Sequence, residues 1–438
     1  MVLLGSNTNQ PNPNLFKGEK PTELLPETYY AYLDSVEQID NEFHIQFDCV
    51  VKKDVESDQI STESLMNLPS IIINTKGSAS EIKSLFNYGN LYQLESQWME
   101  ITTQFDKIGP NLTQSLYFNF QEVRNENSLP FNLKSIRLFR DMSPNEQAKV
   151  RELERATILV ESSTEVIAEF LREAEERLND FSHVNVYNVG QGNCIGLVTS
   201  DNQPLLYFDV GGGYGRNAHT YPIGFKLCNT QNPPVILSHW DQDHYQTAVL
   251  DLEEKIFYSK WLVPFQKIGK TAKHIAYRLQ QENNLICWNE SLDTRMDFTN
   301  FSIIKCSGPT NKKNSSGLAL FVKQCDENHI LLPGDAMFTM IPDCWNENFT
   351  GLVVSHHGSS GEINGMPNAN LPAMTVYSYG QNNHEGHPTE RAQKAYENND
   401  WKNRKDTVDG SIAMTTNLLN LQPPCGGGMC TLNIVQYF

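Results

Sequence analysis

One short segment concentrates side chains that bind divalent metals. The apolar run Val235–Leu237 is followed within a few residues by His239, Asp241, Asp243 and His244. Crowding imidazoles and carboxylates in this way is unfavourable in a folded protein, because the groups lose water and the charged ones repel each other. A bound divalent cation removes that penalty. The segment therefore predicts a metal site directly after a strand, and the alternative is a solvated turn rich in Asp and His.

Further apolar runs along the chain are also followed by Asp or His. The stretches concerned are Ile330–Asp335, Leu352–Ser359 and Tyr377–Pro388. Alone, each is a weak signal, since Gly-Asp is a common turn and paired histidines are often structural. Together they are informative, because five of the eleven histidines fall after such runs or in their short turns: His239, His244, His356, His357 and His387. An α/β scaffold assembles a site in this way along one edge of a sheet.

Length and composition indicate a folded protein of more than one domain. At 438 residues the chain corresponds to about two or three domains. Hydrophobic residues make up 39% of it, which is enough for substantial cores. No apolar run approaches the ~18 residues of a membrane span, and the N-terminus lacks the pattern of a signal peptide. The nine scattered cysteines fit reduced thiols, so we expect a cytoplasmic protein without membrane contact.

The charge bears on which partners are reasonable. A formal net charge of −18 counts against binding nucleic acid through a general basic patch. It does not exclude an enzyme that acts on nucleic acid, since a metal site can hold phosphate itself. Solubility is the simpler explanation of the acidity.

The N-terminal third predicts a small module without recognisable chemistry. Residues 1–20 have no periodicity and are expected to be a flexible arm. Over residues 21–140 we expect an α+β module, with strands at Phe43–Val51, Ser70–Asn74 and Leu116–Phe120. A protein partner could bind through this module.

Residues 141–180 predict a connecting helix. Ser143 is a capping residue, Pro144 occupies the first helical position, and Glu146 completes a capping box. Apolar residues then recur at helical spacing to about Asp180, and the helix could be broken in two near Ser162.

From residue 181 to 438 the sequence pattern changes to short apolar segments, typical of strands, separated by Gly, Asn and Asp. His183–Val189 and Cys194–Val198 are expected to pair as a hairpin around the turn at Gly190–Asn193. Leu205–Asp209 adds a strand that ends in a carboxylate. The pattern predicts an α/β domain whose strand ends carry the polar side chains.

This ordered set of motifs resembles the metallo-β-lactamase superfamily of metallo-hydrolases. The motifs are Phe208–Gly211, Ser238–His244, Gly334–Asp335, His356–Ser359 and Gly386–Pro388. Within the superfamily the chain is most similar to the branch containing the hydrolase domain of the bacterial competence DNA-uptake channel protein. That branch has a turn like Val189–Asn193 and a middle element like Asn314–Ser316. The resemblance covers about residues 183–420, whereas the first 180 residues match no family.

The resemblance implies an αββα sandwich that binds two divalent ions, zinc or manganese, at one sheet edge. One ion would be held by His239, Asp241 and one of His356 or His357. Many members of the superfamily have histidine where this chain has Asp241. A carboxylate there is a harder ligand and shifts the preference from zinc towards manganese or a mixed site.

By the same resemblance, the second ion would be held by Asp243, His244 and His387, with Asp335 bridging the two ions. Asp209 would orient the ligands from behind, which keeps imidazoles in the correct tautomer.

The resemblance also implies a catalytic role for some of these groups. The two ions would activate a water molecule, which Asp243 or Asp335 would orient. His357 or Ser359 would contact the substrate or assist the leaving group.

Several substrate classes remain open. The first is a phosphodiester, which would make the protein a nuclease acting on DNA or oligonucleotides and a candidate effector of bacterial defence. Lys312, Lys313 and Arg216 would then assist in binding the anionic substrate. The alternatives are a small-molecule ester, lactone or thioester hydrolase, and a catalytically silent binding protein on the same fold.

Overall fold

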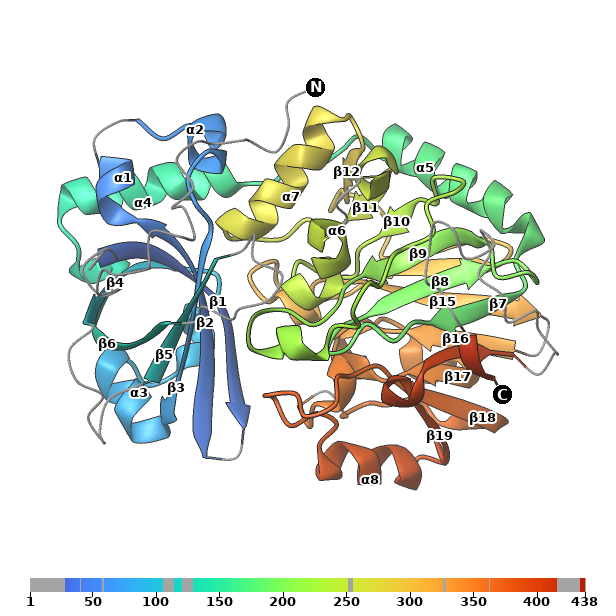
Figure 1. Ribbon diagram of the computed structural model, residues 1–438. Helices are drawn as coiled ribbons and strands as arrows, with labels where there is room; N and C mark the ends of the chain where they lie inside the picture. Colours follow the sequence, from blue (N-terminus) through green and yellow to red (C-terminus); the bar gives the residue numbers. More distant parts are fainter. Residues whose placement is uncertain are drawn as a thin grey trace.

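The computed structural model describes residues 28–39, 41–56, 59–104, 114–119, 129–250, 255–325, 328–361, 363–415 and 434–437. The arm expected over residues 1–20 lies outside this part of the chain. Figure 1 shows two bodies side by side, a barrel built from the N-terminal residues and a layered α/β domain built from the rest. None of the helices among the described residues is long and apolar enough to cross a membrane.

The N-terminal body is a closed barrel of six strands. Its order is β1 (Thr28–Ile39), β2 (Glu42–Val51), β3 (Ile71–Ser78), β5 (Gln114–Asn119), β6 (Leu129–Leu138) and β4 (Trp98–Gln104), which returns to β1. Alternate residues of β1 such as Ala31 and Leu33 fill the barrel core. The intervening Tyr30 and Tyr32 pack outward in a separate cluster, as the two-residue period of a strand requires.

Three short helices accompany the barrel, namely α1 (Lys52–Glu56), α2 (Thr62–Met66) and α3 (Ala79–Phe86). The strands expected at Phe43–Val51, Ser70–Asn74 and Leu116–Phe120 correspond to β2, β3 and β5. The sequence pattern did not predict that the sheet closes, because closure depends on the pairing of β1 with β4, about 70 residues away along the chain.

The connecting segment is two helices, α4 (Pro144–Thr157) and α5 (Thr164–Arg177), so the alternative of a broken helix is the correct one. The expected capping box is present at the start of α4. The Ser143 hydroxyl accepts a hydrogen bond from the Glu146 amide, and the Glu146 carboxylate accepts one from the Ser143 amide at 2.8 Å. A second capping serine, Ser163, starts α5.

The C-terminal body contains two sheets. The first has the order β12 (Leu285–Cys287), β11 (Trp261–Val263), β10 (Val235–Ile236), β9 (Pro204–Val210), β8 (Cys194–Val198), β7 (His183–Val186), β20 (Ser411–Met414) and β21 (Ile434–Tyr437). The second has the order β13 (Arg295–Asp297), β14 (Phe301–Lys305), β15 (Leu318–Cys325), β16 (Asn328–Leu332), β17 (Phe349–Val353), β18 (Ala369–Tyr377) and β19 (Asn403–Asp406). The expected hairpin is confirmed as the antiparallel pair of β7 and β8.

The two sheets pack face to face with helices outside. One core joins residues of both sheets, such as Ile195 and Phe208 with Leu320 and Leu332, and α5 closes one edge of it. Outside the first sheet lie α6 (Gln246–Leu250) and α7 (Lys270–Gln281), and outside the second lies α8 (Glu390–Asn398). This layering is the αββα sandwich expected from the sequence. It brings the ends of β9, β10, β16 and β17 to one side of the molecule.

The barrel is joined to the sandwich by buried polar contacts as well as by α4. Asp48 on β2 accepts hydrogen bonds from the Thr271 amide at 2.5 Å and from the Thr271 hydroxyl at 3.0 Å. Thr271 lies in the first turn of α7, where the residue before the helix, Gly269, offers no capping side chain. A barrel residue therefore caps a helix of the sandwich, which fixes the barrel against it.

Candidate metal centre

The loop after β10 delivers the densest group of ligand side chains. Its backbone is held by the carbonyl of Asp243, which accepts hydrogen bonds from the amides of Asn193 at 3.1 Å and Gly212 at 3.0 Å. A Cβ atom added to Gly211 would lie 1.6 Å from that carbonyl oxygen. Glycine is therefore required at position 211, because the backbone of the ligand loop passes directly against it.

Four side chains converge on one point. The ligand atoms of Asp243, His244, Asp335 and His357 all lie within 4.8 Å of one another, and we call this group the four-residue cluster. His244 Nε2 is 3.1 Å from Asp335 Oδ1, and His357 Nε2 is 3.0 Å from Asp243 Oδ2. Two imidazoles and two carboxylates at this spacing form a typical donor set for a divalent cation.

Hydrogen bonds behind the cluster fix both imidazoles. Nδ1 of His244 donates to Asp209 at 2.7 Å, and Asp209 in turn accepts from the Ser238 amide at 2.7 Å. Nδ1 of His357 donates to the carbonyl of Ser378 at 2.7 Å. Since each Nδ1 carries the proton, each Nε2 turns its lone pair to the cluster, as metal ligation requires.

The charges of the cluster fit a cation. Burial alone would lower the pKa of His244, but the surrounding carboxylates, Asp335 foremost, raise it well above its ordinary value. Burial would raise the pKa of Asp335, yet the neighbouring imidazoles hold it well below its ordinary value. His244 Nε2 and Asp335 Oδ1 are both buried without a hydrogen-bond partner. Buried negative charge and unsatisfied donor atoms are the conditions that a divalent cation relieves.

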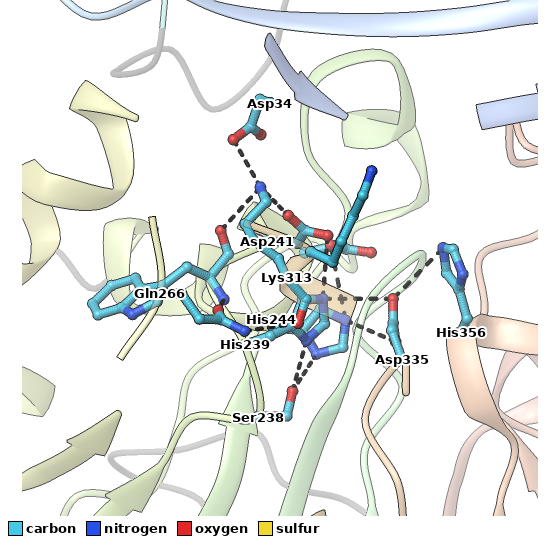
Figure 2. A network of polar contacts seen from close by, with 12 residues as sticks. Asp34, Ser238, His239, Asp241, His244, Gln266, Lys313, Asp335 and His356 are labelled. Carbon is cyan, nitrogen blue, oxygen red and sulfur yellow. Dashed lines mark hydrogen bonds and ion pairs between the residues drawn. The ribbon is translucent and has the colours of Figure 1, made fainter. Parts of the chain in front are cut away.

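A second group lies on the other side of Asp335. His239 Nε2 is 3.2 Å from Asp241 Oδ2 and 3.7 Å from Asp335 Oδ2, and His356 Nε2 is 3.6 Å from the same oxygen of Asp335. Asp335 thus presents Oδ1 to the four-residue cluster and Oδ2 to His239 and His356. Figure 2 shows its carboxylate between these imidazoles. This is where a bridging carboxylate would sit in a two-ion site.

The structure groups two histidines differently from the sequence-based expectation. His357, rather than His387, lies against Asp243 in the four-residue cluster. His387 Nε2 instead pairs with Glu37 Oε1 of the barrel at 3.0 Å, and its ring lies 5.4 Å from that of His356. His356 and His357 both adopt left-handed backbone conformations, with φ of 48° and 53°.

The cluster lies in a large cleft between the barrel and the sandwich. The cleft has a volume of about 1130 Å³. Strands β1 and β2 line one wall, and the side chains of Asp243, Asp335 and His356 line the other. Ser359 and Arg216, two residues expected near the substrate, also line this cleft.

Two of the expected substrate-binding cations are engaged by the barrel. Lys312 Nζ is 2.5 Å from Glu95 Oε2, and Lys313 Nζ is 2.7 Å from Asp34 Oδ1. Lys313 also pairs with Asp241. Both lysines line the cleft, and each already has a carboxylate partner.

Three residues of this region had no signal in the sequence. Asp34 and Glu37 belong to an ordinary strand pattern in β1, far along the chain from the ligands. Gln266, in the loop before α7, donates to the carbonyl of Lys313 at 2.7 Å and accepts from the Trp240 amide at 3.2 Å. Its role could be found only from the tertiary structure.

Comparisons with known proteins are distant. No protein-family model matches the chain, and no curated protein sequence matches it. Among solved structures it is similar to Tm1679, a metal-dependent hydrolase of the β-lactamase superfamily, with 13% identity and a TM-score of 0.30, over 54% of this chain and 100% of that one. It is also similar to CmlA, a diiron β-hydroxylase from Streptomyces venezuelae, with 14% identity and a TM-score of 0.25, over 55% of this chain and 49% of that one. Likeness at this level carries no argument about function.

Proposed function

We propose that the protein is a metal-dependent hydrolase that cleaves phosphodiester bonds in short oligonucleotides. The observation that carries the proposal is the convergence of Asp243, His244, Asp335 and His357 at the base of an open cleft, with Asp335 also facing His239. The expectation of two divalent ions, zinc or manganese, rests on these two neighbouring groups of ligands.

The residues of the metal centre would have different roles in the reaction. Bound divalent ions would supply Lewis acidity and make a water molecule acidic enough to attack at neutral pH. Asp243 lines the cleft and would bind an ion through one carboxylate oxygen, and its other oxygen would accept a proton from that water. Nδ1 of His357 donates to the Ser378 carbonyl, which leaves Nε2 without a proton, so this histidine suits ligation better than protonation of a leaving group.

The size and charge of the cleft favour a short substrate over duplex DNA. A volume of about 1130 Å³ is slightly above the ~300–1,000 Å³ of small-molecule sites. The lysines that would attract a long polyanion are paired with barrel carboxylates. Arg216 and Arg391 line the cleft and are placed to hold individual phosphates.

A second candidate is the hydrolysis of a small carboxylic ester, lactone or thioester. The acidic wall of the cleft favours it, because Glu37, Glu385 and Glu390 also line this space and repel polyanions. The same centre could act on either class, since metal ions stabilise charge on a phosphoryl or a carbonyl oxygen.

A substrate panel tests the proposal. The purified protein would be incubated with plasmid DNA, a short single-stranded oligonucleotide, a cyclic dinucleotide and an aryl ester, each with Mn²⁺, Zn²⁺ or a chelator. We expect metal-dependent cleavage of the oligonucleotide that is lost in Asp243→Ala and kept in Asp180→Ala, a control at an exposed aspartate. Cleavage of the ester alone would favour the second candidate, and hydrolysis of no substrate would contradict both.

A further inference from the structure

Lys313 connects the barrel to the metal centre. Its side chain is buried, and its Nζ atom lies 2.7 Å from Asp34 Oδ1 on β1 and in direct contact with Asp241 Oδ1. Figure 2 shows the amino group of Lys313 between these two carboxylates. Within the described part of the chain, no other ion pairs of Lys313 are found within 4.0 Å.

The lysine remains charged in this position. Its Nζ atom lies within ion-pair distance of two carboxylates, and both favour the ammonium form. One ammonium group therefore forms ion pairs with two carboxylates. A buried charge is costly to leave without a partner, so each member depends on the other two.

Asp241 turns a different oxygen to the histidines. Oδ1 faces Lys313, whereas Oδ2 lies 3.2 Å from His239 Nε2. Asp241 therefore contacts Lys313 through one oxygen and would offer the other to an ion beside His239. Because Asp34 shares the charge of the lysine, Asp241 keeps part of its negative charge for that ion.

Further hydrogen bonds hold Asp34 in the barrel and the backbone of Lys313 in the sandwich. On the barrel side, Gln46 donates to Asp34 Oδ2 at 3.0 Å and accepts from the Tyr214 hydroxyl of the sandwich at 3.0 Å. On the sandwich side, Gln266 holds the backbone carbonyl of Lys313. The lysine is therefore held by groups of both the barrel and the sandwich.

We propose that the N-terminal barrel completes the metal centre, with Asp34 acting as a positioning residue that strengthens cation binding at His239 and Asp241 through Lys313. The four-residue cluster, which Asp34 does not touch, does not depend on it in this way. The inference rests on the metal-binding part of the proposed function and is independent of the substrate.

Metal titration of the full chain tests this inference. The protein would be stripped with a chelator and titrated with Mn²⁺ and with Zn²⁺ by calorimetry. We expect two binding events in the native protein, of which Asp34→Asn weakens one by about 10–100-fold, the usual effect of losing a residue that supports a metal ligand. Asp241→Asn should weaken the same event, and Asp243→Asn the other. Asp54→Asn, the same change at an exposed aspartate of the barrel, should alter neither.

A double variant separates charge sharing from damage to the fold. In Asp34→Asn the lysine has only Asp241 as its partner and competes with the cation. Replacing the lysine as well, in Asp34→Asn/Lys313→Met, removes the competitor and should restore most of the lost affinity.

Native affinity at both positions in Asp34→Asn would overturn the inference. So would a single binding event in the native protein that Asp241→Asn does not affect, or a double variant as weak as Asp34→Asn. If two ions bind as expected but no phosphodiester is cleaved, the proposed function fails while this inference stands.

Discussion

Gly211→Ala should disrupt the metal centre although residue 211 is not a ligand. The added Cβ would lie 1.6 Å from the Asp243 carbonyl oxygen and 2.7 Å from that of Asn193. Carbon and oxygen atoms do not approach closer than about 3.3 Å without strain, so the ligand loop would have to retreat by roughly 1.7 Å.

This displacement of the ligand loop should lower the free energy of unfolding and reduce activity more strongly. It would break the hydrogen bonds from Asn193 and Gly212 to Asp243, each contributing about 0.5–1.5 kcal/mol. With the strain of overpacking, at about 1–3 kcal/mol, we expect the free energy of unfolding to fall by about 2–6 kcal/mol. Asp243 and His244 would move with the loop, and a displacement of about 1 Å in a catalytic group is sufficient for a ~100-fold loss of activity.

Urea denaturation and calorimetric metal titration would measure the two effects. Gly89→Ala is a matched control, because a Cβ there would meet no atom within 4 Å. Native stability and native metal affinity in Gly211→Ala would refute the close approach of the ligand loop to Gly211.

Three further predictions follow from the contacts. Asp209→Asn loses the carboxylate that accepts the hydrogen bond from His244, so metal affinity at the four-residue cluster should fall by about 10–100-fold in a metal titration. The circular dichroism spectrum should not change. Unchanged metal affinity would show that Asp209 does not support the metal ligands. Asp48→Ala removes the cap of α7 and should lower the free energy of unfolding by about 1–3 kcal/mol, measured by urea denaturation. If the free energy of unfolding falls no more than in Asp54→Ala, Asp48 does not act as an interdomain cap. Hydrogen bonds from Arg137 and Lys52 lower the pKa of Glu146, so its stabilising contribution is present above its unfolded pKa, near 4.5, and is lost as the pH falls towards its lower folded pKa. The difference in stability between the native protein and Glu146→Gln should therefore shrink between pH 7 and pH 3, and a constant difference would exclude this ion pair as the cause.

The parts of the fold with local causes could be predicted from the sequence. The capping box at Ser143 and the hairpin of β7 and β8 depend on residues close together in the chain. The ligand side chains follow buried strands, so polar side chains at strand ends could be predicted. The pattern predicted a metal site after Val235–Leu237, and in the structure Asp243 and His244 of that segment lie in the four-residue cluster.

The parts that depend on distant contacts could not be predicted. Asp34 and Glu37 lie on β1, an ordinary strand in the sequence, and reach the centre only because the barrel docks against the sandwich. The contacts of His357 with Asp243 and of His387 with Glu37 are tertiary contacts, which the side-chain pattern does not encode. Closure of the barrel likewise depends on the pairing of β1 with β4.

The most direct test of the central claim is an anomalous diffraction experiment on crystals grown with Mn²⁺ or Zn²⁺. We predict a peak enclosed by Asp243, His244, Asp335 and His357, with Nε2 of each histidine about 2.0–2.2 Å from the ion, and a second peak beside His239 and Asp241. An ordered site with no anomalous density among these four side chains would contradict the assignment of this centre as a metal-dependent hydrolase.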